Sequence, residues 1–160
     1  MNAKMQPFWW FKKPEAPPCP SGEQLTNEGF ETGDLTGWVG TGDTYVTDEY
    51  KRSGNYSCNI DLIRGVYQTL AEPLLVDCVD VAELYSRRTE ESGSGAFTVM
   101  VYFTDGSQDG KNDWAPYGEW KKLDFKDILV SGKIIERIGI INGGESTRIL
   151  IDDVSLTGTG

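Results

Sequence analysis

From residue 21 onward, the chain alternates short apolar runs with glycine-containing turn sequences, a pattern typical of β-sandwiches and β-barrels. Residues 55–62 show it most clearly, because apolar and polar side chains follow one another with a period of two, which predicts a strand with one buried face. The apolar set is Tyr56, Cys58, Ile60 and Leu62. Glycines at residues 92–95, 105–106, 131–132 and 142–144 supply the positive φ that tight turns require.

Six further runs are predicted to form strands. They are Val66–Leu70, Leu75–Arg87, Phe97–Thr104, Trp120–Phe125, Ile134–Ile141 and Arg148–Leu156. The chain has 19 glycines among 160 residues, and long helices tolerate glycine poorly. We therefore expect an all-β domain of about eight strands, arranged as an antiparallel two-sheet sandwich.

The first twenty residues differ in composition from the rest. They contain five of the seven prolines and four consecutive aromatic residues. Proline fixes φ and removes amide donors, so we expect residues 1–20 to form an extended arm and residues 21–160 to form the β-domain.

The aromatic run of the arm suggests a partner. Burying four large rings at ~25 cal/mol per Å² would release several kcal/mol, so we expect Phe8, Trp9, Trp10 and Phe11 to bind protein subunits of a larger assembly. The alternative is that these rings fold back on their own domain.

Composition excludes several functions. The chain has no histidine, which excludes a Ser-His-Asp hydrolase, a Cys-His protease and an imidazole-ligated zinc site. Its net charge of −10 disfavours binding to nucleic acid. No apolar run approaches the ~18 residues that span a bilayer, and the common nucleotide-binding and hydrolase motifs are missing from the sequence. We expect a protein that is not an enzyme and does not insert into membranes.

The sequence begins without the apolar stretch of a signal peptide, which predicts synthesis in the cytoplasm without the usual export signal. The chain has three cysteines, and an odd number does not indicate a secreted disulfide framework. Cys58 is expected to be buried, and Cys78 could approach it if their strands are neighbours, so the sequence leaves a disulfide between them open. Cys19 would remain available for a cross-link to a partner.

Three passages together resemble the carbohydrate-binding-module-like, or galactose-binding-like, β-jelly rolls. They are residues 27–38 (NEGFETGDLTGW), 53–57 (SGNYS) and 151–156 (IDDVSL). Residues 66–68 and 101–106 fit in the same order, so the resemblance spans roughly residues 25–157. It implies a jelly-roll fold in which Phe30, Leu35 and Trp38 fill the core. Such folds serve sugar binding, protein binding and virion decoration alike.

The resemblance also implies one structural Ca²⁺, held by Glu31, the carbonyls around Ser53 and Gly54, and Asp152. Asn27-Glu28 departs from the usual pattern of the family at the first-strand ligand. The alternative is that the two carboxylates accept only water or backbone amides.

A second candidate calcium site lies within one short stretch of the sequence. Asp105, Asp109 and Asp113 have the spacing of a calcium loop that turns at a glycine. Pro116 stands where an EF-hand has its bidentate glutamate. The alternative is therefore a polar loop between two strands.

A sugar site needs flat aromatic rings and planar polar groups. Alternation places Glu83, Tyr85 and Arg87 on one face of a strand, and we expect Tyr102 of the following strand to join them. Trp114 and Tyr117 would supply aromatic rings at the rim. The alternative is an ordinary sheet surface with cross-strand aromatic pairs.

Two functional hypotheses follow. The first is a non-enzymatic structural or decoration protein, anchored by its arm on a virion capsid or similar particle and projecting the jelly roll. The second is a soluble carbohydrate-binding module that recognises glycans.

Overall fold

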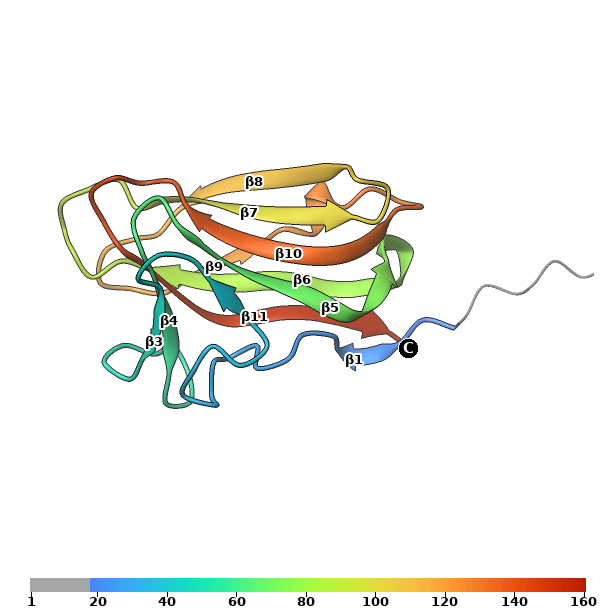
Figure 1. Ribbon diagram of the computed structural model, residues 1–160, viewed down its shortest axis with the longest axis horizontal. Helices are drawn as coiled ribbons and strands as arrows, with labels where there is room; N and C mark the ends of the chain where they lie inside the picture. The colour runs from blue at the N-terminus through green and yellow to red at the C-terminus, as the bar shows by residue number, and fades with distance from the viewer. Residues whose placement is uncertain (1–17) are drawn as a thin grey trace, which may run out of the picture.

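The computed structural model describes residues 18–160, which form two antiparallel sheets packed face to face (Figure 1). The strands are β1 (Ser21–Glu23), β2 (Val39–Gly40), β3 (Tyr45–Thr47), β4 (Ser57–Ile60), β5 (Gly65–Leu75), β6 (Val79–Arg87), β7 (Ala96–Phe103), β8 (Gln108–Trp114), β9 (Lys121–Asp124), β10 (Ile134–Asn142) and β11 (Ile149–Thr159). Two 3₁₀ turns, η2 (Val76–Cys78) and η3 (Lys126–Ile128), are the only helical segments in the described part. The predicted all-β sandwich is confirmed.

The six-stranded sheet has the order β3-β4-β11-β6-β9, with β1 paired to β11. The five-stranded sheet has the order β2-β5-β10-β7-β8. The longest strands of each sheet occupy its centre and carry most of the buried side chains, as expected for a core formed between two sheets.

Strand alternation places the core between the sheets. In β7, Phe97, Val99, Val101 and Phe103 are buried, whereas the side chains between them face outward. Burial of each such side chain contributes roughly 1.5–3 kcal/mol. The opening segment also enters this core, because the rings of Phe30 and Trp38 are buried with their centroids 5.3 Å apart. Leu35 packs against the same cluster, so the three core predictions are confirmed.

The predicted strand Leu75–Arg87 begins too early, because its first four residues are the end of one strand and a turn. β5 ends at Leu75, η2 turns the chain, and β6 begins at Val79 in the other sheet. Val76 and Cys78 are buried and Asp77 between them is exposed, so the alternation of a strand continues through the turn and hides it in the sequence.

The disulfide between Cys58 and Cys78 that the sequence left open does not form. Cys19 forms a disulfide with Cys78, with their Cα atoms 5.2 Å apart, so Cys19 is not free to bond a partner. Cys58 is a buried free thiol, and burial raises its pKa. It cannot reach Cys78, because β11 lies between β4 and β6 and pairs with both.

The start of the described chain and its C-terminus lie together, where β1 pairs with β11 of the six-stranded sheet (Figure 1). β1 pairs with the end of β11, and the amide of Gly160 donates to the carbonyl of Pro20 at 3.0 Å. The aromatic run Phe8–Phe11, on which the predicted arm and its partners depend, lies outside the described residues. Within residues 18–160, no helix has the length and apolarity needed to cross a membrane.

Candidate functional site

The outer side of the five-stranded sheet carries a group of aromatic, arginine and amide side chains that could bind a ligand. We call it the tyrosine face and define it by the outward residues of β5, β10, β7 and β8. The outward residues that give it its name and its polar groups are Tyr67, Arg137, Gly139, Met100, Tyr102, Gln108 and Asn112. Strand register sets two neighbouring rows across this face, Tyr67–Gly139–Met100 and Arg137–Tyr102–Gln108.

Gly139 makes room for the ring of Tyr67. A Cβ atom on this residue would lie 2.6 Å from Cδ1 of Tyr67 and 3.5 Å from Cε2 of Tyr102. The ring of Tyr67 therefore lies over the bare backbone of the central strand. The two ring centroids are 6.5 Å apart and the rings are inclined by 52°. Burial raises the pKa of Tyr67, and the neighbouring Tyr102 adds to this, while Arg137 opposes it.

Arg137 fills the space beside these rings. Its guanidinium carbon lies 4.0 Å from the ring centroid of Tyr102 and 5.3 Å from that of Tyr67. Such cation–π contacts hold the guanidinium plane against the aromatic faces. Within residues 18–160, no carboxylate lies within 4.0 Å of this guanidinium, and no hydrogen bond engages its N–H groups.

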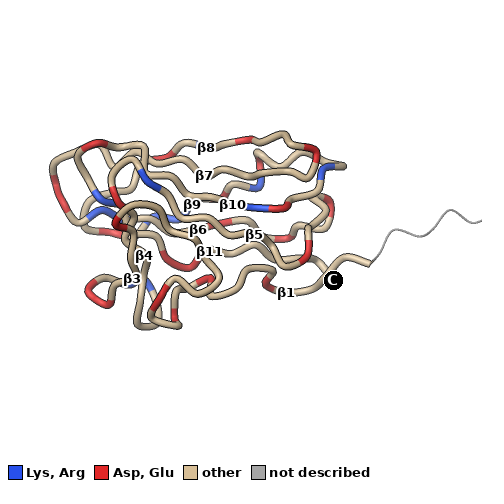
Figure 2. The backbone as a smooth tube through the Cα atoms, viewed as in Figure 1, with Lys and Arg blue, Asp and Glu red and all other residues tan. Residues whose placement is uncertain are grey.

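The charged side chains of β8 point away from the tyrosine face. Lys111 reaches toward the other sheet, with its Nζ 2.9 Å from a carboxylate oxygen of Asp127. Asp113 pairs with Lys121 of β9 at 2.8 Å. The alternate residues of β8 that face outward are Gln108, Gly110, Asn112 and Trp114, none of them charged. The adjacent strand β7 has no charged residue, as its uniform colour in Figure 2 shows.

The predicted sugar patch is divided between the two sheets, so that prediction is wrong as a single site. Glu83, Tyr85 and Arg87 lie on the outer side of the six-stranded sheet, whereas Tyr102 lies on the outer side of the five-stranded sheet. Alternation along a strand identifies its outer side but does not show which sheet contains the strand. Trp114, 57% exposed, ends β8 on the side of Tyr102.

The half of the patch on β6 is partly covered. The guanidinium carbon of Arg52 lies 3.5 Å from the ring centroid of Tyr85. That of Arg87 lies 5.0 Å from the ring centroid of Tyr50. A polar hollow of about 240 Å³ beside Tyr85 is lined by Glu23, Glu28, Arg52, Glu83, Tyr85, Asp153, Val154 and Ser155. The hollow holds four carboxylates and one arginine, so it lacks an open aromatic surface.

Tyr117 is 50% exposed and lies in the segment after β8, where it forms a bridge with Arg88. The guanidinium of Arg88 donates to the carbonyls of Glu90, Ser94 and Ala115, which ties the surrounding loops together. Tyr117 is therefore placed at one end of the sandwich and is not an outward residue of either sheet.

The sequence analysis missed Tyr67 and Arg137. The alternation of residues 66–69 marks Tyr67 as an outward residue of its strand. Arg137 is harder to assign, because the register of β10 shifts between Ile135 and Arg137. A bulge of this kind reverses the side on which the following residues lie.

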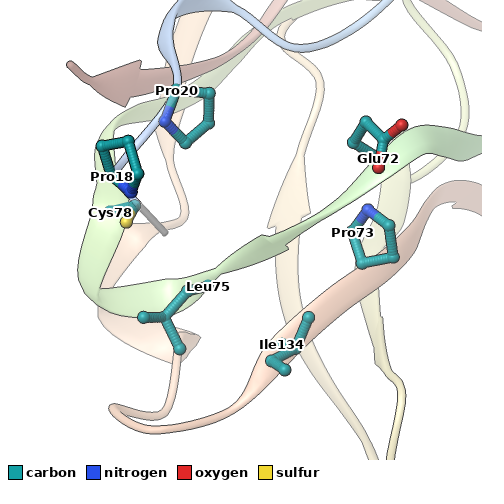
Figure 3. A pocket seen from close by; sticks show the side chains of 7 residues that line it. All are labelled: Pro18, Pro20, Glu72, Pro73, Leu75, Cys78 and Ile134. Atoms are coloured by element: carbon teal, nitrogen blue, oxygen red, sulfur yellow. The ribbon is translucent and has the colours of Figure 1, made fainter. Parts of the chain in front are cut away.

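An apolar hollow of about 370 Å³ lies beside the disulfide (Figure 3). It is lined by Pro18, Pro20, Glu72, Pro73, Leu75, Cys78 and Ile134. It offers one carboxylate and no aromatic ring, so it has few of the groups that bind sugars.

The residues predicted at the first calcium site do converge. The carboxylate of Glu31 accepts the amide of Asn55 at 2.9 Å, and a Cβ on Gly54 would overlap that carboxylate. The carboxylate of Asp152 accepts the amide of Ser53 at 3.3 Å. Segments far apart in the sequence are therefore held together around two acidic side chains.

The environment of Asp152 has the charge that would suit a cation. Its side chain is fully buried, and burial, with a smaller contribution from Asp153, raises its pKa to about 6. Arg52 pairs with Asp153 and leaves Asp152 without a cationic partner. Within residues 18–160, no three acidic or cysteine side chains could hold a metal ion by themselves. A Ca²⁺ here would therefore need backbone carbonyls besides Glu31 and Asp152, which hard oxygen ligation allows.

The second predicted calcium site, formed by Asp105, Asp109 and Asp113, is wrong because these residues do not form a single loop. Residues 105–107 form the turn of the β7–β8 hairpin, where the carboxylate of Asp105 accepts the amide of Ser107 at 2.8 Å. Asp109 and Asp113 lie four residues apart on β8, which separates them by ~13 Å along an extended strand. The glycine that would turn the loop, Gly110, is part of the strand instead.

No protein-family model matches the sequence, and a search of curated proteins gives no match. Solved structures do match. The module TmCBM61, solved with β-1,4-galactotriose, is 21% identical over 86% of this chain and 99% of the module, with a TM-score of 0.58. The CBM22-1 xylan-binding domain of Paenibacillus barcinonensis Xyn10C is 19% identical over 88% of this chain and 97% of that domain, with a TM-score of 0.55.

A family 16 carbohydrate-binding module has a higher TM-score of 0.60 at 14% identity, over 84% of this chain and 99% of the module. These modules are each covered almost completely, so the shared unit is a whole domain. Identities at this level establish the fold, while function depends on the residues of the site. Residues 18–160 therefore have the β-jelly-roll fold of carbohydrate-binding modules.

Proposed function

We propose that this protein is a non-catalytic carbohydrate-binding module and that its tyrosine face holds the glycan. The observation that carries the proposal is the group formed by Tyr67, Tyr102 and Arg137 over the bare backbone of Gly139. It combines half-buried aromatic rings with a fixed cluster of N–H donors on an open sheet surface.

This chemistry suits a sugar. Pyranose rings present apolar C–H surfaces that pack on aromatic side chains, and their hydroxyls need planar hydrogen-bonding groups. Gln108 and Asn112 provide amide groups along β8, next to the tyrosines. A row of outward side chains across several strands would match an extended polysaccharide chain rather than a compact small molecule.

The fold supports this function more than display on a particle surface. Similar structures include a xylan-binding domain and a module complexed with galactotriose. Display depends on Phe8–Phe11, which lie outside the described residues. Attachment through that segment remains compatible with a sugar-binding domain, and it would be tested separately by deleting residues 1–17.

Affinity electrophoresis and calorimetry against a set of soluble polysaccharides test the proposal. Tyr67→Ala and Tyr102→Ala should each weaken binding at least tenfold, because each removes part of the aromatic surface. Tyr85→Ala is the matched control, since it removes a half-buried tyrosine from the outer side of the other sheet. Loss of binding in Tyr85→Ala with retention in the other two would move the site to β6 and reject the proposal.

We also propose that Glu31 and Asp152, with nearby backbone carbonyls, hold one structural Ca²⁺. The converging carboxylates and the absence of a cationic partner for Asp152 within residues 18–160 support it. Saturating chelator should lower the melting temperature of the wild type, and Glu31→Gln should abolish that shift. Asp109→Asn, which removes a carboxylate from β8, should leave it intact. A melting temperature that calcium and chelator leave unchanged would reject the metal.

A further inference from the structure

Arg137 indicates which class of polysaccharide the tyrosine face would select. Resting on the proposed function, we propose that the ligand is an acidic polysaccharide, and that Arg137 binds an anionic group, carboxylate or sulfate, carried by one of its sugar units. The argument depends on how the guanidinium is held and on the charges around it.

The guanidinium is held by its faces and free at its edge. Tyr102 and Tyr67 lie 4.0 and 5.3 Å from its central carbon, so the rings restrain the side chain and exclude water from its flat surfaces. Its N–H donors have no hydrogen-bonding partner within residues 18–160. Guanidinium edges match the paired oxygens of carboxylates and sulfates, and a restrained arginine loses less entropy when it binds them.

Three other arginines are engaged by groups of the protein itself. Arg52 pairs with Asp153, and Arg148 pairs with Asp61 at 3.0 Å. Arg88 donates to backbone carbonyls. Arg64, Arg87, Arg88 and Arg137 have no carboxylate partner within residues 18–160, and of these Arg137 is the one that lies on the tyrosine face. An anion supplied by the ligand would provide the missing partner.

The surroundings of Arg137 do not cancel its charge. Glu136 precedes it in the β10 bulge and is exposed, with no carboxylate oxygen within 4.0 Å of the guanidinium. The acidic side chains of β8 face the other sheet, where Asp113 pairs with Lys121. Charges farther than about 8 Å are largely screened at physiological ionic strength. Acidic side chains elsewhere, which give the chain its net charge of −10, would repel a polyanion where they lie. Because of the screening, they would not cancel the attraction at Arg137.

Matched polymer pairs separate the charge of the ligand from its sugar. One pair is polygalacturonate and the same polymer after its carboxylates have been reduced to alcohols. The other is a sulfated galactan and its desulfated form. We expect at least tenfold tighter binding to the charged member of one pair, and the pair that shows the difference identifies the anionic group.

Arg137→Gln should remove this preference, so that the charged and neutral members bind with equal affinity, and thermal unfolding of the variant shows that it is folded. Arg137→Lys keeps the charge without the planar fork and should retain part of the preference. Lys122→Gln is the control, because it removes one positive charge from the outer side of the other sheet and should leave the preference unchanged.

The outcomes distinguish this inference from the proposed function. Equal binding to charged and neutral members, or a preference that survives Arg137→Gln, would overturn the inference that Arg137 binds an acidic polysaccharide. Neither result would contradict the proposal that the protein binds carbohydrate. Failure to bind any of these polymers or the neutral polysaccharides used above would reject both. Weakening of the preference by added salt in the wild type but not in Arg137→Gln would support the ion pair.

Discussion

Gly139 of β10 and Tyr67 of β5 are paired across neighbouring strands, and the tyrosine ring occupies the space where a side chain on residue 139 would lie. Gly139→Ala should therefore displace the ring of Tyr67 and weaken polysaccharide binding by about tenfold. The fold should tolerate the change, because alanine is at least as favourable as glycine in a strand. Calorimetry and thermal unfolding of the same variant measure the two effects separately.

Gly143→Ala is the matched control for this prediction. A Cβ at residue 143 would contact only the carbonyl of Ala96 at 3.9 Å, so both binding and melting temperature should stay close to wild type. If Gly139→Ala bound polysaccharide as tightly as wild type, the position of the tyrosine ring would be irrelevant to the ligand.

The Cys19–Cys78 disulfide closes a loop of 59 residues and joins the start of the described chain to the η2 corner. By the chain-entropy estimate, its loss should lower the free energy of unfolding by up to ~4 kcal/mol. Cys19→Ser, Cys78→Ser and the double variant should unfold at a similarly reduced temperature, because each removes the same bond.

Thiol counting tests the pairing itself. The unreduced protein should present no reactive thiol when folded and one when unfolded, since Cys58 is fully buried. Cys58→Ala should eliminate that thiol and leave the bond intact. Three thiols in the unfolded, unreduced protein would contradict the disulfide.

Gln68 connects the opening segment to the five-stranded sheet. Its side chain is buried, accepts the amide of Thr26 at 2.7 Å and donates to the carbonyl of Thr26 at 2.9 Å. Gln68→Leu should cost roughly 2–4 kcal/mol of unfolding free energy, because it leaves both backbone groups of Thr26 without that partner. Denaturant unfolding measures it. Gln24→Leu is the control, since its side chain bonds carbonyls of adjacent, exposed residues, and it should change stability by less than ~1 kcal/mol.

The all-β class could be predicted from the sequence because period-two alternation is a local property of each strand. β4 shows this, since Cys58 and Ile60 are buried where the pattern places them. The corner at Val76–Cys78 was missed for a related reason. Buried Val76 and Cys78 flank exposed Asp77 there, so the period-two alternation of the strands continues through the turn.

The site was predicted less well, because it depends on which strands share a sheet. Tyr85 and Tyr102 are both outward residues of long strands, yet they lie in different sheets. The disulfide was missed for the same reason, since Cys19 and Cys78 meet only through the packing of distant segments. By contrast, Glu31 and Asp152 could be placed together because the resemblance supplied the long-range arrangement that local patterns lack.

Asp152 makes stability depend on pH in an unusual direction. Its pKa is about 6 in the folded protein against an ordinary value of 3.8, so the folded state takes up a proton that the unfolded state does not. Its stabilising contribution is complete below pH 3.8 and is lost as the pH rises through 6. In chelator, lowering the pH from 7 to 5 should therefore increase the free energy of unfolding by about 1 kcal/mol. The slope should vanish in Asp152→Asn.

The carboxyls of Asp61, Asp77 and Asp105 act in the opposite direction, because hydrogen bonds from backbone amides and serine hydroxyls lower their pKa. Their contribution is present above pH 3.8 and is lost only at lower pH, outside the window of Asp152. Bound Ca²⁺ would favour the ionised form of Asp152 and reverse its slope between pH 7 and 5. Thermal unfolding at both pH values, with chelator and with saturating calcium, tests this directly: identical slopes in the two conditions would show that no cation engages Asp152.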